Sequence, residues 1–219
     1  MSTIIQRSTC RERAAFGLID DIGGIVTVLL AIFGIAGLYA PILAAIATIL
    51  FGVALLAQGR TLFAHYTQAS VEVIAKTPVS DPAAYAPIAV ILLSAAGAAL
   101  GVLALLDVNS AVLTPIASII FGAALVLSSV SAWRLNAISR ASAKGQASLR
   151  DMLEYQMAFD SLGVQTFAGL AAIIFGILGA SGATYDLTFN LMALLILGSA
   201  LILKGGSLNA ILLSFMRAV

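Results

Sequence analysis

Residues 46–56 read IATILFGVALL and residues 116–126 read IASIIFGAALV, so one apolar stretch of helical length recurs along the chain. A weaker third copy survives as LGSALI at 197–202. The stretch IFGIAG at 32–37 also returns as IFGILG at 174–179, in front of the last copy. Self-similarity at a fixed spacing indicates a repeated structural unit. The unit expected here is a helical hairpin that is used three times.

The composition places these hairpins in a lipid bilayer. Hydrophobic residues make up 61% of the 219 residues and charged residues only 10%, whereas a soluble domain has about 25% charged residues. A spanning helix needs about 20 apolar residues. Six segments without Asp, Glu, Lys, Arg or His approach that length: 22–39, 41–57, 86–106, 111–130, 164–180 and 187–203.

The predicted fold is an all-α membrane protein that forms one domain over residues 1–219. Its six transmembrane helices are three tandem hairpins, at about 20–59, 81–133 and 160–206. Because each unit crosses the bilayer twice, all copies keep the same orientation. Only an axis along the membrane normal can relate such copies, and we therefore expect a pseudo-threefold arrangement rather than inverted repeats.

The distribution of charge predicts the orientation. The connections at 39–40, 107–110 and 181–186 are short, whereas the links 58–85 and 131–163 are long and hold most of the charge. With a cytoplasmic N-terminus, all 11 Lys and Arg residues lie on the cytoplasmic side. The positive-inside rule favours this topology, which places both termini in the cytoplasm.

Small residues on the repeated helices are the candidate functional positions, because helices in lipid approach closely where side chains are small. Thr48 and Gly52 are four residues apart, as are Ser118 and Gly122, so each pair lies on one helix face. The full set expected to pack between helices is Gly34, Gly37, Thr48, Gly52, Gly97, Gly101, Ser118, Gly122, Gly176, Gly179 and Gly198.

Sites for chemistry are not expected. No catalytic residue, cofactor site or metal site is predicted, because the sequence has no phosphate loop, nucleophile elbow or paired intramembrane carboxylates. The single Cys10 and the single His65 cannot form an internal disulfide or a multi-ligand zinc site. A net charge of +1 gives no surface for nucleic acid. Proton-coupled transport also lacks support, because the spans hold no ionisable group.

Several positions outside the spans keep two interpretations. His65 could sense pH or be a solvated residue, and Cys10 could be acylated or idle. Residues 148–160 could form a helix on the inner leaflet that contacts lipid or a partner, or serve as a connector. Boundary charges could pair within each hairpin, as Asp21 with Arg60, Asp81 with Arg134 and Asp160 with Lys204.

The hairpin itself resembles a known family. Residues 30–41, LAIFGIAGLYAP, followed by 46–59 with its Phe51-Gly52 and LLAQG at 55–59, are similar to the repeat of HdeD-like acid-resistance membrane proteins. The resemblance implies a bacterial inner-membrane protein linked to acid stress and gives no catalytic residues to transfer. The predicted function is a non-enzymatic structural or interaction protein that contacts membrane lipids and forms a homo-oligomer or binds a membrane-protein partner. The alternative is a channel or permease for a small uncharged solute.

Overall fold

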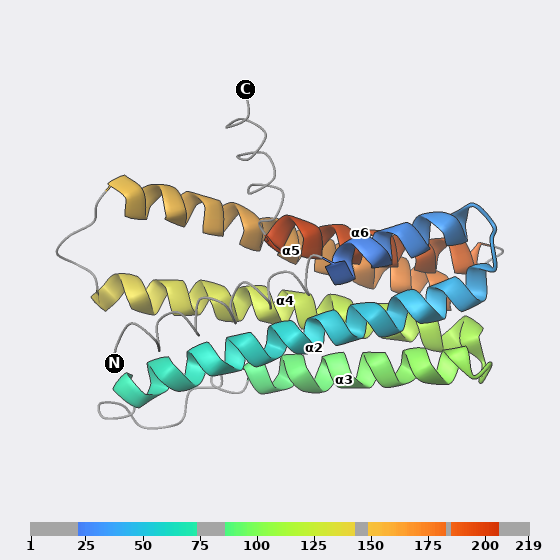
Figure 1. The fold of residues 1–219 in the computed structure, drawn as a ribbon, viewed down its shortest axis with the longest axis horizontal. Helices are drawn as coiled ribbons and strands as arrows, with labels where there is room; N and C mark the ends of the chain where they lie inside the picture. Colours follow the sequence, from blue (N-terminus) through green and yellow to red (C-terminus); the bar gives the residue numbers. More distant parts are fainter. Residues whose placement is uncertain (1–21, 74–85, 143–148, 183–184, 206–219) are drawn as a thin grey trace.

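The fold is that of an all-α membrane protein, which confirms the predicted class. The computed structural model describes residues 22–73, 86–142, 149–182 and 185–205, with side chains described at 22–60, 88–130, 163–182 and 185–203. No strand occurs in these ranges. The helices, shown in Figure 1, are Ile22–Ile35, α2 (Ala40–Val73), α3 (Ala86–Leu105), α4 (Ser110–Ser142), α5 (Leu149–Ala180) and α6 (Asp186–Gly205).

Five of these helices, α2 to α6, are long and apolar enough to cross a membrane. The spanning part of α2, Ala40–Arg60, is about 31 Å long at 1.5 Å per residue, which matches the thickness of bilayer hydrocarbon. The helix Ile22–Ile35 is apolar but shorter. The chain is therefore a multi-pass membrane protein.

The first helix ends earlier than the predicted limit at Tyr39, and a C-terminal cap explains why. Gly37 has φ +87°, its N–H donates to the Gly34 carbonyl at 3.0 Å, and the Leu38 N–H donates to the Phe33 carbonyl at 3.3 Å. This pair of bonds is the Schellman motif, which satisfies the last carbonyls and stops a helix. Hydropathy does not detect this stop because residues 36–39 are themselves mostly apolar.

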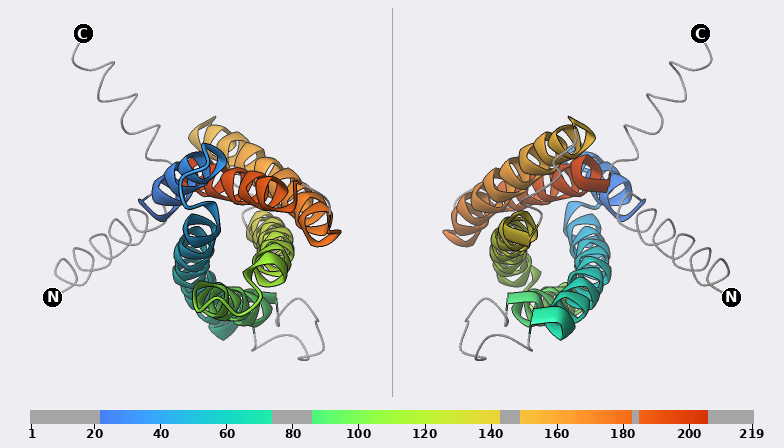
Figure 2. Two further views of the ribbon diagram at one scale, coloured as in Figure 1. Left: turned by 90° about the vertical axis from the view of Figure 1, so that its right-hand side faces the viewer. Right: turned by 90° about the vertical axis from the view of Figure 1, so that its left-hand side faces the viewer.

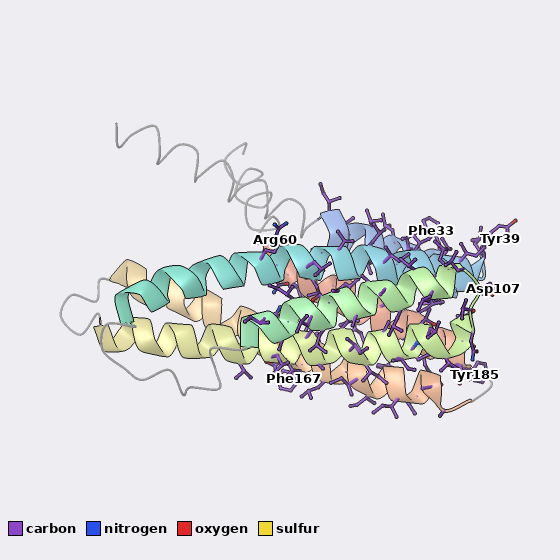
Figure 3. All side chains as sticks on the ribbon, turned by 90° about the horizontal axis from the view of Figure 1, so that it is seen from below. Phe33, Tyr39, Arg60, Asp107, Phe167 and Tyr185 are labelled. Atoms are coloured by element: carbon purple, nitrogen blue, oxygen red, sulfur yellow. The ribbon has the colours of Figure 1, made fainter. Side chains whose placement is uncertain are left out.

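The second short turn repeats this geometry, and the three short turns lie at one end of the bundle, called the turn end from here on. Asp107 has φ +61° and Gly182 has φ +78°, the values closest to that of Gly37. After α3, the Asp107 and Val108 N–H groups donate to the Ala104 and Leu103 carbonyls, as Gly37 and Leu38 do in the first turn. Tyr39, Asp107 and Tyr185 all lie at the turn end (Figure 3).

The helices form a closed ring around three central helices. The helices α2, α4 and α6, which are the second members of the hairpins, contact one another at the centre. Helix α3 packs between α2 and α4, and α5 packs between α4 and α6. The helix Ile22–Ile35 meets α2 through Gly23 and Ala54, and α6 through Gly24 and Gly198. Figure 2 shows this arrangement along the bundle.

The core repeats residue for residue on the central helices. Ala47, Ala117 and Ala193 are fully buried, and so are the larger residues one and two turns further along: Phe51, Phe121 and Leu197 in one layer, and Leu55, Leu125 and Leu201 in the next. The Phe51 and Phe121 rings meet edge to face with centroids 5.0 Å apart. This burial pattern is what a pseudo-threefold axis between α2, α4 and α6 requires.

At the end opposite the turns, three helices extend beyond their apolar spans (Figure 1). Helix α2 continues to Val73 and α4 to Ser142, and α5 begins at Leu149, well before its apolar span at Gly163–Ala180. Of the stretch 148–160 considered above, residues 149–160 are helical and continuous with α5, so they do not form a separate helix. No proline interrupts residues 149–163, so the helix continues through them.

Candidate functional site

The closest backbone approaches lie between hairpins, at glycines that occupy equivalent places. A Cβ atom added to Gly122 of α4 would lie 2.6 Å from the Gly169 carbonyl oxygen of α5, and one added to Gly198 would lie 3.1 Å from the Gly24 oxygen. A Cβ atom on Gly52 would lie 2.8 Å from the Ala98 Cβ of α3. These three glycines, one per hairpin, each face the first helix of the next hairpin around the ring.

The other predicted packing positions lie as follows. Added Cβ atoms at Gly101 and Gly176 would meet Ile49 and Ile119 at 3.0 and 2.6 Å. One at Gly34 would lie 2.8 Å from Leu191, and one at Gly97 would overlap the Phe121 ring. Gly179 faces the Asp186 carbonyl oxygen at 3.1 Å. Thr48 and Ser118 are fully buried.

Gly37 is a correction to the predicted set. It has no atom within 4 Å of an added Cβ atom, and its φ of +87° places it in the turn. The role of Gly37 is conformational, because a positive φ is strained for residues that carry a Cβ atom but not for glycine.

The pairing of first helices inferred from IFGIAG and IFGILG is wrong by three residues. An added Cβ atom on Gly24 meets Gly198, Leu201 and Ile202, and one on Gly169 meets Gly122, Leu125 and Val126, so Gly24 and Gly169 are counterparts. By this register Gly34 corresponds to Gly179, and Gly176 to Gly101. Glycines three residues apart at 176, 179 and 182 allow the sequences to be aligned one helical turn out of register.

Sequence reasoning missed Gly24 and Gly169, the glycines that face Gly198 and Gly122. A signal for Gly169 was present in the sequence. Gly169 and Gly176 are seven residues apart, which is nearly two full turns, so they lie on one face of the helix.

Most hydroxyls in the buried core bond to their own helix. Thr48 Oγ1 donates to the Ala44 carbonyl at 2.7 Å, and Ser94 Oγ donates to the Val90 carbonyl at 2.6 Å. Thr27 and Thr114 donate in the same way to the carbonyls four residues earlier. These groups are therefore satisfied without water or a ligand.

Hydrogen bonds between side chains also join helices in the described part of the chain. Ser118 Oγ of α4 donates to Asn190 Oδ1 of α6 at 2.7 Å, and both residues are fully buried. Ser129 and Thr166 join α4 to α5 with their hydroxyl oxygens 2.8 Å apart. Such bonds in lipid contribute roughly 0.6 kcal/mol each on average, so they align helices more than they stabilise them.

The charged side chains of the described part lie at the edges of the spanning region. No group of three His, Cys, Asp or Glu residues among them could hold a metal ion. Arg60 lies at one edge of the spanning region, and Asp107 and Asp186 at the other. The interpretations of Cys10 and His65, and the proposed pairing of Asp21, Asp81, Arg134, Asp160 and Lys204, lie outside the described side chains.

Comparisons with known proteins returned no matching family model, no matching curated protein and no matching solved structure. The HdeD-like resemblance thus stays a prediction from the sequence.

Proposed function

We propose that the chain is a non-enzymatic structural or interaction protein of a bacterial inner membrane, with a role in the response to acid or a related stress. The proposal implies that the protein conducts no solute, and the observation that carries this point is the packing along the central axis. The inward-facing layers at Phe51, Phe121 and Leu197 and at Leu55, Leu125 and Leu201 are fully buried. The stress role rests on the HdeD-like resemblance alone.

The same packing argues against the channel alternative. A path for a polar solute needs exposed hydrogen-bonding groups along its depth, whereas the described hydroxyls of the core bond to backbone carbonyls of their own helices, to Asn190 or to another hydroxyl. Two successive apolar layers would have to separate before a solute could pass along the axis.

The proposed orientation places the turn end outside the cell and both termini in the cytoplasm. Tyr39 and Tyr185 are exposed at the turn end, where aromatic side chains fit the membrane interface. Arg60 lies at the opposite edge of the described side chains (Figure 3). Because this topology assigns every Lys and Arg of the sequence to that side, the positive-inside rule supports a cytoplasmic placement.

Helix α3 supports an association with a second copy of the chain. It is the least covered of the five spanning helices, and its exposed surface includes Ala95, Ala96 and Ala99. Small side chains on a surface in lipid allow another helix to approach closely. Large exposed apolar side chains, such as Leu92 of α3 itself and Phe33 and Phe167 of other helices, suit contact with lipid.

A flux assay tests the proposal. Protein reconstituted into liposomes should give the same rates of glycerol, urea and proton entry as protein-free liposomes, because the apolar layers close the axis. Phe121→Ala serves as a comparison, since it removes a ring from one layer. Solute entry through the unmodified protein that changes in Phe121→Ala would contradict the proposal and favour the channel.

A further inference from the structure

Three polar residues lie near one another at the turn end of the core. Asn190 lies one helical turn after Asp186, the first residue of α6, so both point along one face of that helix. Ser118 reaches this face from α4 through its 2.7 Å bond to Asn190 Oδ1. We refer to Ser118, Asp186 and Asn190 as the polar node.

The node contains a donor and an acceptor that the protein leaves unsatisfied. Asn190 is fully buried, and no described residue accepts a hydrogen bond from its Nδ2 atom. The Oδ1 atom of Asp186 is likewise buried and receives no hydrogen bond from any described residue. Leaving such groups unpaired is costly inside a membrane, where the bilayer supplies no alternative partner.

The two unsatisfied atoms are complementary. The Asn190 amide can donate and the Asp186 oxygen can accept, and the residues are i and i+4 on one helix, with Cβ atoms about 5–6 Å apart. A single water molecule accepts a hydrogen bond from an amide and donates one to a carboxylate oxygen, and therefore satisfies both atoms at once.

The surroundings favour a ligand as small as water. An added Cβ atom on Gly179 of α5 would lie 3.1 Å from the Asp186 carbonyl oxygen and 3.5 Å from the Asn190 backbone nitrogen, and the Pro115 Cβ atom of α4 lies 3.6 Å from the same point. The walls are therefore close. Asp186 is partly exposed at the start of α6, so its carboxylate is within reach of water from the turn end.

We propose that the polar node binds a structural water molecule, held between Asn190 Nδ2 and Asp186 Oδ1. Water then enters the bundle as far as Ser118, while the layers at Phe51, Phe121 and Leu197 and beyond stay dry. The site is independent of the proposed function, because a non-conducting bundle and a channel could both hold it.

Magnetisation transfer from water to side-chain amides in lipid bilayers tests this proposal. Asparagine occurs at Asn109, Asn136, Asn190 and Asn209, so 15N-asparagine labelling gives four side-chain amides, and the signal lost in Asn190→Leu assigns the relevant one. We expect the Asn190 amide to receive magnetisation from water as fast as that of exposed Asn109. Asp186→Leu should slow this transfer several-fold, whereas Asp186→Asn, which keeps an acceptor oxygen, should preserve it.

Two results would overturn the water site. One is an Asn190 side-chain amide that receives no magnetisation from water in the unmodified protein. The other is an Asn190 amide that donates to Ser118 Oγ, because the side chain would then be turned and its donor already satisfied. Both are read in the unmodified protein, so they do not depend on the folding of a variant.

Discussion

The substitution Gly122→Ala tests the glycine contact between α4 and α5 with the smallest possible change. The new Cβ atom would lie 2.6 Å from the Gly169 oxygen, 2.8 Å from Ile173 Cγ1 and 3.2 Å from the Ile173 nitrogen. Two of these three atoms belong to the backbone of α5, so a change of rotamer cannot relieve the contact. The helices must separate by several tenths of an ångström, and the dispersion contacts along the contact surface weaken.

The expected change in the free energy of unfolding is the difference between two opposing contributions, overpacking and helix propensity. Overpacking typically costs about 1–3 kcal/mol, whereas alanine is better than glycine inside a helix by roughly 0.5–1 kcal/mol. We therefore expect Gly122→Ala to lower the free energy of unfolding by about 0.5–2 kcal/mol. Thermal unfolding in detergent, followed by circular dichroism, measures the change.

Gly163→Ala is the matched control. Gly163 also lies within a helix, α5, and has no atom within 4 Å of an added Cβ atom. Only the helix-propensity term applies there, so this variant should be more stable than the unmodified protein by roughly 0.5–1 kcal/mol. The two substitutions are chemically identical and should shift stability in opposite directions. If both raised stability, the close approach of α4 and α5 would be refuted.

Three further predictions concern the contact between α4 and α5, the turn after α3 and the orientation in the membrane. The double substitution Gly122→Ala with Gly169→Ala should lower the free energy of unfolding by less than the sum of the two single substitutions, because one separation of α4 from α5 relieves both contacts. Strict additivity would contradict a contact surface shared by the two glycines. Asp107→Gly should raise the unfolding temperature, with a gain of up to about 1 kcal/mol, because Asp107 has a positive φ that strains a residue with a side chain; Val108→Gly, a change outside the positive-φ position, is the control, and an equal gain there would count against this reasoning. Cysteines at Asn109 and Thr184 should react with an impermeant reagent in intact cells, whereas cysteines at Lys76 and Ala143 should not, and labelling at position 143 would reverse the orientation.

The sequence predicted the spans well because lipid imposes a single requirement, a long apolar helix, that hydropathy reads directly. It also located Gly52, Gly122 and Gly198, since these glycines sit inside a recognisable repeat. It failed where apolarity carries no information. The cap at Gly37 lies among apolar residues, and the extensions of α2, α4 and α5 are helical without being apolar.

The partners of each residue could not be predicted because they depend on how the hairpins close around the axis. The sequence marks Gly24 and Gly169 as ordinary glycines in apolar helices, and only the ring brings their carbonyls against Gly198 and Gly122. The bond between Ser118 and Asn190 joins residues that are 72 positions apart, and neither shows by its neighbours that it faces the other. The direction of each core hydroxyl likewise depends on its rotamer.

The central structural claim, that three hairpins close into a ring, depends on the contact between the first helix and α6, which short turns do not impose. Disulfide formation tests it directly in a Cys10→Ser background. A Cβ atom on Gly24 would lie 3.1 Å from the Leu201 Cβ atom, and the equivalent distance from Gly169 to Leu125 is 3.3 Å. Both are close to the Cβ separation of a disulfide, about 3.5–4.5 Å.

We predict that Gly24→Cys with Leu201→Cys cross-links on mild oxidation as efficiently as Leu125→Cys with Gly169→Cys. Gly24→Cys with Leu203→Cys should not cross-link, since Leu203 is 56% exposed and faces away from the contact between the first helix and α6. Cross-linking of the Leu125 and Gly169 pair, together with none between positions 24 and 201, would show that the third hairpin does not close on the first and would contradict the threefold ring.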